Sequence, residues 1–381
     1  MRAQIETPEP ITYIPPPPPD PSDIEVPDQD VLDDEHKETF RQALRRLLST
    51  PLAEYTYAQI LDGLPTEPSL RDSYVWMPRH PVYELEHTEL CEGFLDKARD
   101  FMTKFDAFGL RFKQSLLRAF QNTTSGSQQF NLRLIELVVV ACHQIAAHLY
   151  ELDDGAHKHQ LHQDWVDAES QVTEKEARYR SYALTPTAFF HRFYQAYDQY
   201  PRGCADVAGY WAEGKIFGGV VVFDRGETEQ ECNSMWIHGS KYRGPKTLYP
   251  PMPEQFDALI SFLLAKPDDE VPCPLPIFGT RMNRPRWDAY DAITRFHIFR
   301  DKYERKVPTT RPQPGRVQDG ADWPEILDEH IVMTAMRHRR WGRPVDEEEL
   351  AAAQARLKEV TPSSPCWTQY VPNSEHEPQV D

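Results

Sequence analysis

The fold class is decided by residues 130–152, which read FNLRLIELVVVACHQIAAHLYEL. Apolar side chains recur there at steps of three and four, as on a helix that is buried on most sides: Leu134, Ile135, Val138, Val139, Cys142 and Leu149. The apolar run 132–147 contains Arg133 and Glu136, and it is shorter than the ~20 residues that span a bilayer. The sequence therefore predicts a core helix, which Asp153-Asp154-Gly155 should end or interrupt.

The rest of residues 31–200 is predicted to be helical as well. Thr50 and Pro51 should begin a helix that Gly63 ends. The longest periodic stretch covers about 86–120, and we interpret its apolar stripe as core, the alternative being a ligand-lining surface: Leu90, Phe94, Ala98, Phe101, Phe105, Phe108, Phe112, Leu116 and Phe120. Because neighbouring helices with short connections pack side by side, we expect a mainly α fold built as an antiparallel helical bundle.

One small β-element interrupts the helical pattern. Residues 216–223, IFGGVVVF, are apolar and lack a helical period, and residues 233–238 alternate between apolar and polar side chains. We predict a β-hairpin over about 216–238 with a long polar tip. Because Gly218 and Gly219 have no side chains, a neighbouring backbone should approach closely there. Further helices are expected at 253–265, 323–341 and 346–359.

Both ends of the chain have the composition of solvated tails. Residues 1–30 hold nine prolines, seven acids and one Arg, and residues 361–381 hold four prolines and three acids without Lys or Arg. Such segments bury too little apolar surface to offset the entropy of ordering, so both tails are predicted to be disordered. No Gly/Ser-rich linker divides residues 31–360, which favours a single domain there.

Composition and charge narrow the class of protein. The 381 residues contain 42 Lys or Arg and 60 Asp or Glu, and the formal net charge of −18 argues against general binding of nucleic acid or anionic lipid. The start of the chain lacks the apolar core of a signal peptide, and the six cysteines form no CxxC pair. These features predict a cytoplasmic or nuclear protein with reduced thiols and no membrane span.

A histidine-rich segment, residues 143–164, is the first candidate site. It holds five of the fourteen histidines together with several acids, and neutral imidazole with carboxylate is the ligand set that Zn, Fe or Mn requires. The candidate metal ligands are His148, Glu151, His157, His159 and His162. The sequence has no HExxH signature and no duplicated Glu-x-x-His, so the alternative is a solvated helix end whose histidines form hydrogen bonds.

The hairpin supplies a second candidate site. Asp224 and Arg225 follow its first strand, and His238 ends the partner strand. If the strands pair, Asp224 and His238 can form a carboxylate–imidazole pair, but spacing alone does not establish catalytic geometry. The alternative is a structural turn in which the planar guanidinium of Arg225 binds an internal acid of the helical part.

Two other segments can bind partners. The proline run from Pro15 to Pro19 favours polyproline II, the conformation in which SH3-like and WW-like domains bind peptides. Four arginines between Arg337 and Arg343 can bind phosphate or RNA, or serve as a nuclear-import patch, despite the acidic chain. The alternatives are a solvated tail for the prolines and the basic end of a helix for the arginines.

One stretch carries a resemblance. Residues 209–227, GYWAEGKIFGGVVVFDRGE, are followed by MWIH at 235–238 and QFDALISFLL at 255–264. This pattern resembles a family of uncharacterised filamentous-fungal (ascomycete) proteins that share a YWAE-x-x-IFGGVVxFDRG segment. The resemblance covers roughly residues 180–310. It implies a cytosolic or nuclear protein linked to secondary metabolism, and it assigns no catalytic residue.

Two classes of function are compatible with these features. The first is an interaction or accessory protein, favoured by the proline run, the acidic tails, the arginine patch and the missing catalytic signature. The second is a cytosolic small-molecule-binding protein or enzyme that uses the histidine-rich segment 143–164 or the hairpin residues 224–238. A deep apolar pocket lined by the phenylalanine stripe would favour the second class, and a filled core would favour the first. The sequence specifies neither a cofactor nor an oligomeric state.

Overall fold

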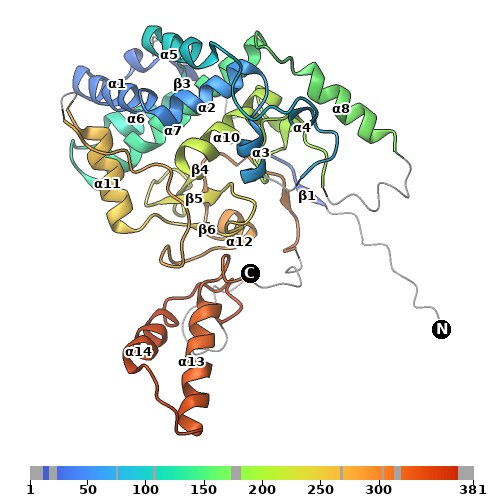
Figure 1. Ribbon diagram of the computed structural model, residues 1–381. Coiled ribbons are helices and arrows are strands. Elements are labelled where there is room, and N and C mark those ends of the chain that lie inside the picture. The colour runs from blue at the N-terminus through green and yellow to red at the C-terminus, as the bar shows by residue number, and fades with distance from the viewer. Residues whose placement is uncertain are drawn as a thin grey trace.

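The computed structural model is mainly helical (Figure 1), which confirms the predicted class. It describes residues 12–16, 24–73, 76–105, 109–172, 182–266, 269–302, 304–312 and 319–367. These residues form thirteen α-helices and several small sheets.

The predicted core helix is present as α7 (Gln128–Leu152). Ser127 caps its first turn by accepting a hydrogen bond from the Phe130 amide, and Asp153 ends it in the left-handed conformation. Around it pack α1 (Asp34–Leu48), α2 (Pro51–Asp62), α6 (Gln114–Gln121) and α10 (Cys204–Phe217). By length and composition α7 could cross a membrane, but 83% of its apolar window is buried inside the protein, as in a core helix.

The other helices lie around this centre. As predicted, Thr50 caps α2 and Gly63 ends it in the left-handed conformation. The remaining helices of the main body are α3 (Glu67–Ser73), α4 (Pro81–Glu84), α5 (Phe94–Lys104), α8 (Gln160–Ser170), α11 (Pro253–Leu264) and α12 (Ala289–Thr294).

The phenylalanine stripe is divided between α5 and α6 rather than continuous. The chain becomes extended at Phe105, and β3 (Phe112–Lys113) pairs with β2 (Glu25–Val26) before α6 begins. A regular spacing of apolar residues does not reveal where backbone pairing with a distant strand interrupts a helix. Part of the stripe does belong to the core, since Phe112 and Phe120 are almost completely buried. Phe108 lies outside the described residues.

The predicted hairpin is present and belongs to a larger sheet. β4 (Gly219–Asp224) pairs with β5 (Met235–Gly239), and β6 (Leu248–Tyr249) and β7 (Ile298–Phe299) complete a curled four-stranded antiparallel sheet in the order β6-β5-β4-β7. The predicted strand start was wrong, because Ile216 and Phe217 are the last residues of α10. Gly218 ends that helix with a φ of 93°, which an L side chain rarely adopts.

The close approach expected at the strand glycines is found. A Cβ atom at Gly219 would lie 2.4 Å from the His238 carbonyl oxygen. We therefore expect Gly219→Val to lower the free energy of unfolding in urea by ~1–3 kcal/mol, because the added methyl groups overpack the sheet. Gly109→Val is the matched control, since no described atom lies within 4 Å of its added Cβ. Equal loss in both variants would contradict this packing argument.

The N-terminal tail was predicted wrongly in part. β1 (Tyr13–Ile14) pairs with β8 (Val307–Pro308), and β2 pairs with β3. Asp28 is fully buried and forms an ion pair with Arg41. Backbone hydrogen bonds to distant strands hold this segment, and composition does not encode them. Pro15 and Pro16 are exposed, while the rest of the proline run up to Pro19 lies outside the described residues.

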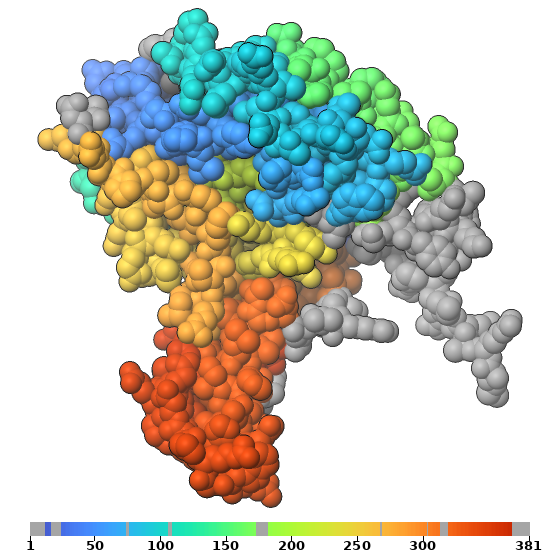
Figure 2. All heavy atoms as spheres, in the orientation of Figure 1, coloured from blue at the N-terminus to red at the C-terminus, as the bar shows by residue number. Residues whose placement is uncertain are grey.

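At the other end, two helices project from the body as a hairpin (Figures 1 and 2). They are α13 (Glu325–Arg340) and α14 (Glu347–Arg356), close to the predicted bounds. They share a small apolar cluster that includes Val332 and Leu350. Residues 361–367, predicted as tail, return to the hairpin, where Cys366 is buried; residues 368–381 lie outside the described part. The single domain over 31–360 stays a prediction.

Candidate metal centre

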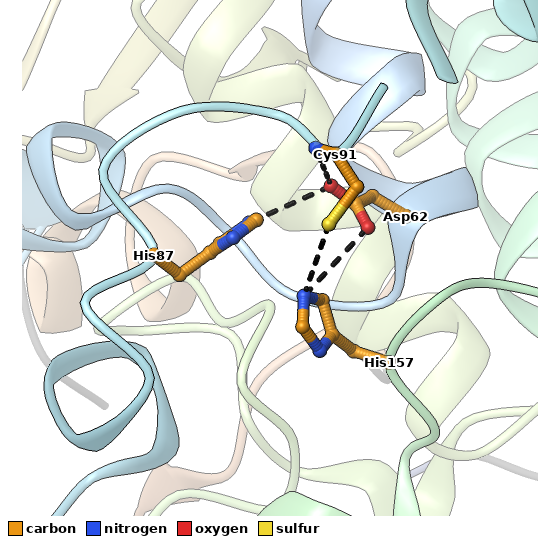
Figure 3. Close-up of side chains that lie close together, drawn as sticks. All are labelled: Asp62, His87, Cys91 and His157. Atoms are coloured by element: carbon orange, nitrogen blue, oxygen red, sulfur yellow. Dashed lines mark hydrogen bonds and ion pairs between the residues drawn. The ribbon is translucent and has the colours of Figure 1, made fainter. Parts of the chain in front are cut away.

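Four potential metal ligands meet between the helices (Figure 3). Asp62 is the last residue of α2, His87 follows α4, Cys91 precedes α5, and His157 lies between α7 and α8. One ligand atom of each side chain lies within 4.8 Å of those of the other three. Three separate parts of the chain, namely the end of α2, the α4–α5 loop and the α7–α8 loop, therefore deliver donor atoms to one point.

Two of the separations between ligand atoms match those of a tetrahedral zinc site, and none exceeds 4.8 Å. The Cys91 Sγ lies 3.4 Å from the His157 Nε2. The Asp62 carboxylate lies 3.6 Å from the His87 Nε2 through Oδ2 and 3.9 Å from the His157 Nε2 through Oδ1. With metal–ligand bonds of ~2.0–2.3 Å, tetrahedral geometry separates ligand atoms by roughly 3.3–3.8 Å. Small rotations of the side chains would therefore suffice to hold the ion.

The backbone around the group is tightly packed. The His157 amide donates a 2.9 Å hydrogen bond to the Asp62 carbonyl oxygen. A Cβ at Gly63 would lie 1.8 Å from the His157 carbonyl oxygen, and one at Gly155 would lie 2.4 Å from the Asp62 carbonyl oxygen. The Cys91 amide donates a 2.8 Å hydrogen bond to Asp62 Oδ2. These contacts fix three of the ligands relative to one another.

The interior of the group is short of hydrogen-bond partners. Asp62 Oδ1 and His87 Nε2 are buried, and neither has a hydrogen-bond partner among the described residues. Burial lowers the pKa of His87 despite the Asp62 carboxylate beside it, and burial together with that carboxylate raises the pKa of the Cys91 thiol. Buried polar atoms without partners are costly, and a bound cation would satisfy both of them.

Of the five predicted metal ligands, only His157 belongs to this group. The other four side chains have different partners: His148 stacks on Phe101, Glu151 forms an ion pair with Arg202, His159 stacks on Tyr150, and His162 forms a hydrogen bond with the Thr185 carbonyl oxygen. Asp153, in the left-handed conformation at the end of α7, turns the chain between Glu151 and His157.

Asp62, His87 and Cys91 were not among the predicted metal ligands. The available signals were the His-x-x-x-Cys spacing of His87 and Cys91 and the position of Asp62 directly before a helix-ending glycine. Neither signal points to a metal without knowledge that the two segments meet near His157.

The predicted carboxylate–imidazole pair does not form. In the β4–β5 register His238 lies opposite Val220, whereas the Asp224 amide bonds to Ser234 at the other end of the hairpin. This register places the two residues at opposite ends of the paired strands. His238 is fully buried between Phe193 and Tyr194, and burial lowers its pKa well below the ordinary value.

Arg225 has the internal acidic partner that was expected. Its Nη2 donates a 2.6 Å hydrogen bond to Glu136 of α7, and its Nε donates to the Phe299 carbonyl oxygen. Glu136 also accepts a hydrogen bond from Arg133 at 2.9 Å. The network joins the core helix to β7, which favours the structural interpretation of this turn.

A second buried network lies beside it. His143 contacts Glu213 through Nδ1 at 2.7 Å and Asp206 through Nε2 at 3.2 Å. Arg300 donates to Glu213 at 3.0 Å and forms an ion pair with Glu304. Although burial alone would lower it, the pKa of His143 is raised by its two carboxylates, and burial raises the pKa of Glu304 to about 7. His143 thus has both ring nitrogens engaged.

Comparison with known proteins assigns neither a family nor a function to this chain. No protein-family model, no curated protein and no solved structure matches this chain.

Proposed function

We propose that this protein binds one zinc ion through Asp62, His87, Cys91 and His157. One observation carries the proposal: four donor atoms from three separate parts of the chain lie within 4.8 Å of one another. That two of these atoms are buried without hydrogen-bond partners supports it further.

The choice of zinc follows from the donor set. Thiolate and imidazole favour zinc over magnesium or calcium, which prefer oxygen ligands. A thiolate and a carboxylate also carry two negative charges, which Zn²⁺ would balance. A neutral cluster is far less costly to bury than an uncompensated carboxylate.

The role best supported is structural. Four protein ligands complete a tetrahedron, whereas a catalytic zinc keeps one position open for water or substrate. Asp62 and His87 are buried, with relative exposures of 0% and 6%, and none of the four lines a described cleft. The ion would fasten the segments before α5 and α8 to the end of α2.

Metal content tests the proposal. Protein purified and dialysed after growth with zinc should retain about one zinc per chain by inductively coupled plasma mass spectrometry. His87→Ala and Cys91→Ala should each reduce the zinc content at least tenfold, because three ligands hold the ion poorly. His159→Ala and Cys273→Ala, which alter the same residue types outside the group, should keep it. Wild-type protein that takes up no zinc would overturn the proposal.

A partner-binding role is the second candidate function, and one observation favours it. The projecting α13–α14 hairpin exposes Met333, Met336 and Trp341 beside Arg337 and Arg340. Protein interfaces are enriched in Met, Trp and Arg, and the arginines suit an acidic partner. This agrees with the accessory role and the link to fungal secondary metabolism suggested by the resemblance, both of which stay proposals.

A further inference from the structure

A cleft of about 1070 Å³ lies along one face of α7, away from the metal ligands. It is bounded by α6, by residues 109–113, by residues 200–206 and by residues 299–302. This is not the apolar pocket that the phenylalanine stripe would have formed, since of the stripe only Phe105 and Leu116 line it. Its volume suits a small molecule.

The floor of the cleft explains why a core helix carries polar residues. The polar side chains of α7 that line it are Arg133, Glu136, His143, Gln144 and His148. At 100° per residue they fall within about 140° of one helix face. The polar face of α7 is therefore turned towards the cleft, while its remaining faces form the core.

The cleft is basic although the protein is acidic. Eight Lys or Arg and five Asp or Glu line it, in a chain whose net charge is −18. Four of the five acids are already engaged: Glu136 is shared by Arg133 and Arg225, Asp301 binds Lys113, Glu229 binds Lys302, and Asp206 contacts His143. The fifth, Glu25, is exposed.

The excess positive charge lies on two exposed arginines. Arg118 on α6 has no carboxylate partner among the described residues, and neither has Arg111. Arg111 donates only through Nη2 to the Glu25 carbonyl oxygen, at 2.6 Å, so most of its guanidinium stays available. Gln144 fixes the Arg111 backbone to α7 through two hydrogen bonds. Both arginines line the same cleft.

We propose that this cleft binds a small organic anion through carboxylate or phosphate oxygens, with Arg111 and Arg118 as its principal ligands. The planar fork of a guanidinium matches either oxyanion. The buried ion pairs on the floor hold the cleft open and are satisfied among themselves, so selectivity arises at the two arginines. The proposal is independent of zinc.

Isothermal titration calorimetry with citrate and with pyrophosphate tests this proposal. Both titrations use zinc-loaded protein dialysed free of unbound zinc, at constant ionic strength, because both anions chelate free zinc. We expect at least one of the two anions to bind with a stoichiometry near one, and Arg111→Gln with Arg118→Gln to weaken that binding at least tenfold. Binding of citrate alone identifies a carboxylate ligand, and binding of pyrophosphate alone identifies a phosphate ligand.

The matched control is Arg337→Gln with Arg340→Gln, which removes two exposed charges from α13, outside the cleft. This variant should bind the anion as the wild type does. The proposal is overturned if neither anion binds the wild type. It is also overturned if the control and the cleft variant lose affinity equally, because the anion would then be attracted by positive charge anywhere on the protein.

Discussion

Removal of zinc should lower the melting temperature of the wild-type protein by roughly 5–10 °C. A ligand present at ~1,000 times its Kd stabilises the folded state by about 4 kcal/mol, and one kcal/mol shifts Tm by a few degrees in a large domain. Without the ion, the buried Asp62 carboxylate faces His87 and His157, and two buried polar atoms lack partners. Differential scanning calorimetry before and after treatment with a chelator measures the shift.

The control for this prediction is His87→Ala. Because this variant lacks one ligand, its melting temperature should already be low and should not change further with chelator. Re-addition of zinc should restore the wild type and leave the variant unchanged. A chelated, metal-free wild type that melts at the original temperature would show that the four side chains form a stable hydrogen-bonded group without metal.

The second large effect is expected for Arg225→Ala. The substitution leaves Glu136 buried with a single guanidinium, and it removes hydrogen bonds to the carbonyl oxygens of Phe299 and Arg300. Loss of one partner of a buried ion pair costs about 3–5 kcal/mol when the remaining charge is left uncompensated. Because Arg133 still pairs with Glu136, we expect a loss at the lower end of this range, about 3 kcal/mol. Urea denaturation should show this loss in the free energy of unfolding.

Two variants separate the buried charge from general effects of arginine removal. Arg45→Ala breaks an exposed pair with Glu38 and should cost no more than about 1 kcal/mol. Arg225→Met with Glu136→Gln removes the buried carboxylate together with Arg225 and should recover part of the loss. Arg133 then keeps its hydrogen bond to the Gln230 carbonyl oxygen. If Arg225→Ala is as mild as Arg45→Ala, the network does not hold β4 and β7 to α7.

Much of the local structure could be predicted from the sequence. The start of α2 at Thr50 and its end at Gly63, and the hairpin around Gly219, depend on neighbouring residues, and each is found. The acidic partner of Arg225 could be predicted as a type of residue, because a buried guanidinium needs a carboxylate. Which acid it is, Glu136, depends on the packing of β4 against α7.

The start of β4 shows how local signals compete. Ile216 and Phe217 have the β-branched and aromatic character of strand residues, yet they end α10. Gly218 directly after them was the better signal, because many helices end at a glycine in the left-handed conformation. Propensity is a weak guide where tertiary packing covers every side of a segment, as it does here.

The sequence by itself determined the helical class, the core helix and the two ends of α2, because spacing, caps and left-handed glycines act over a few residues. Only the tertiary structure decided the two candidate sites. Asp62 and His157 are 95 positions apart and meet because α2 and α7 pack together. Arg111 and Arg118 belong to one cleft because the polar face of α7 is turned towards them. Local sequence specifies which side chains can bind a ligand, and long-range packing specifies which of them meet.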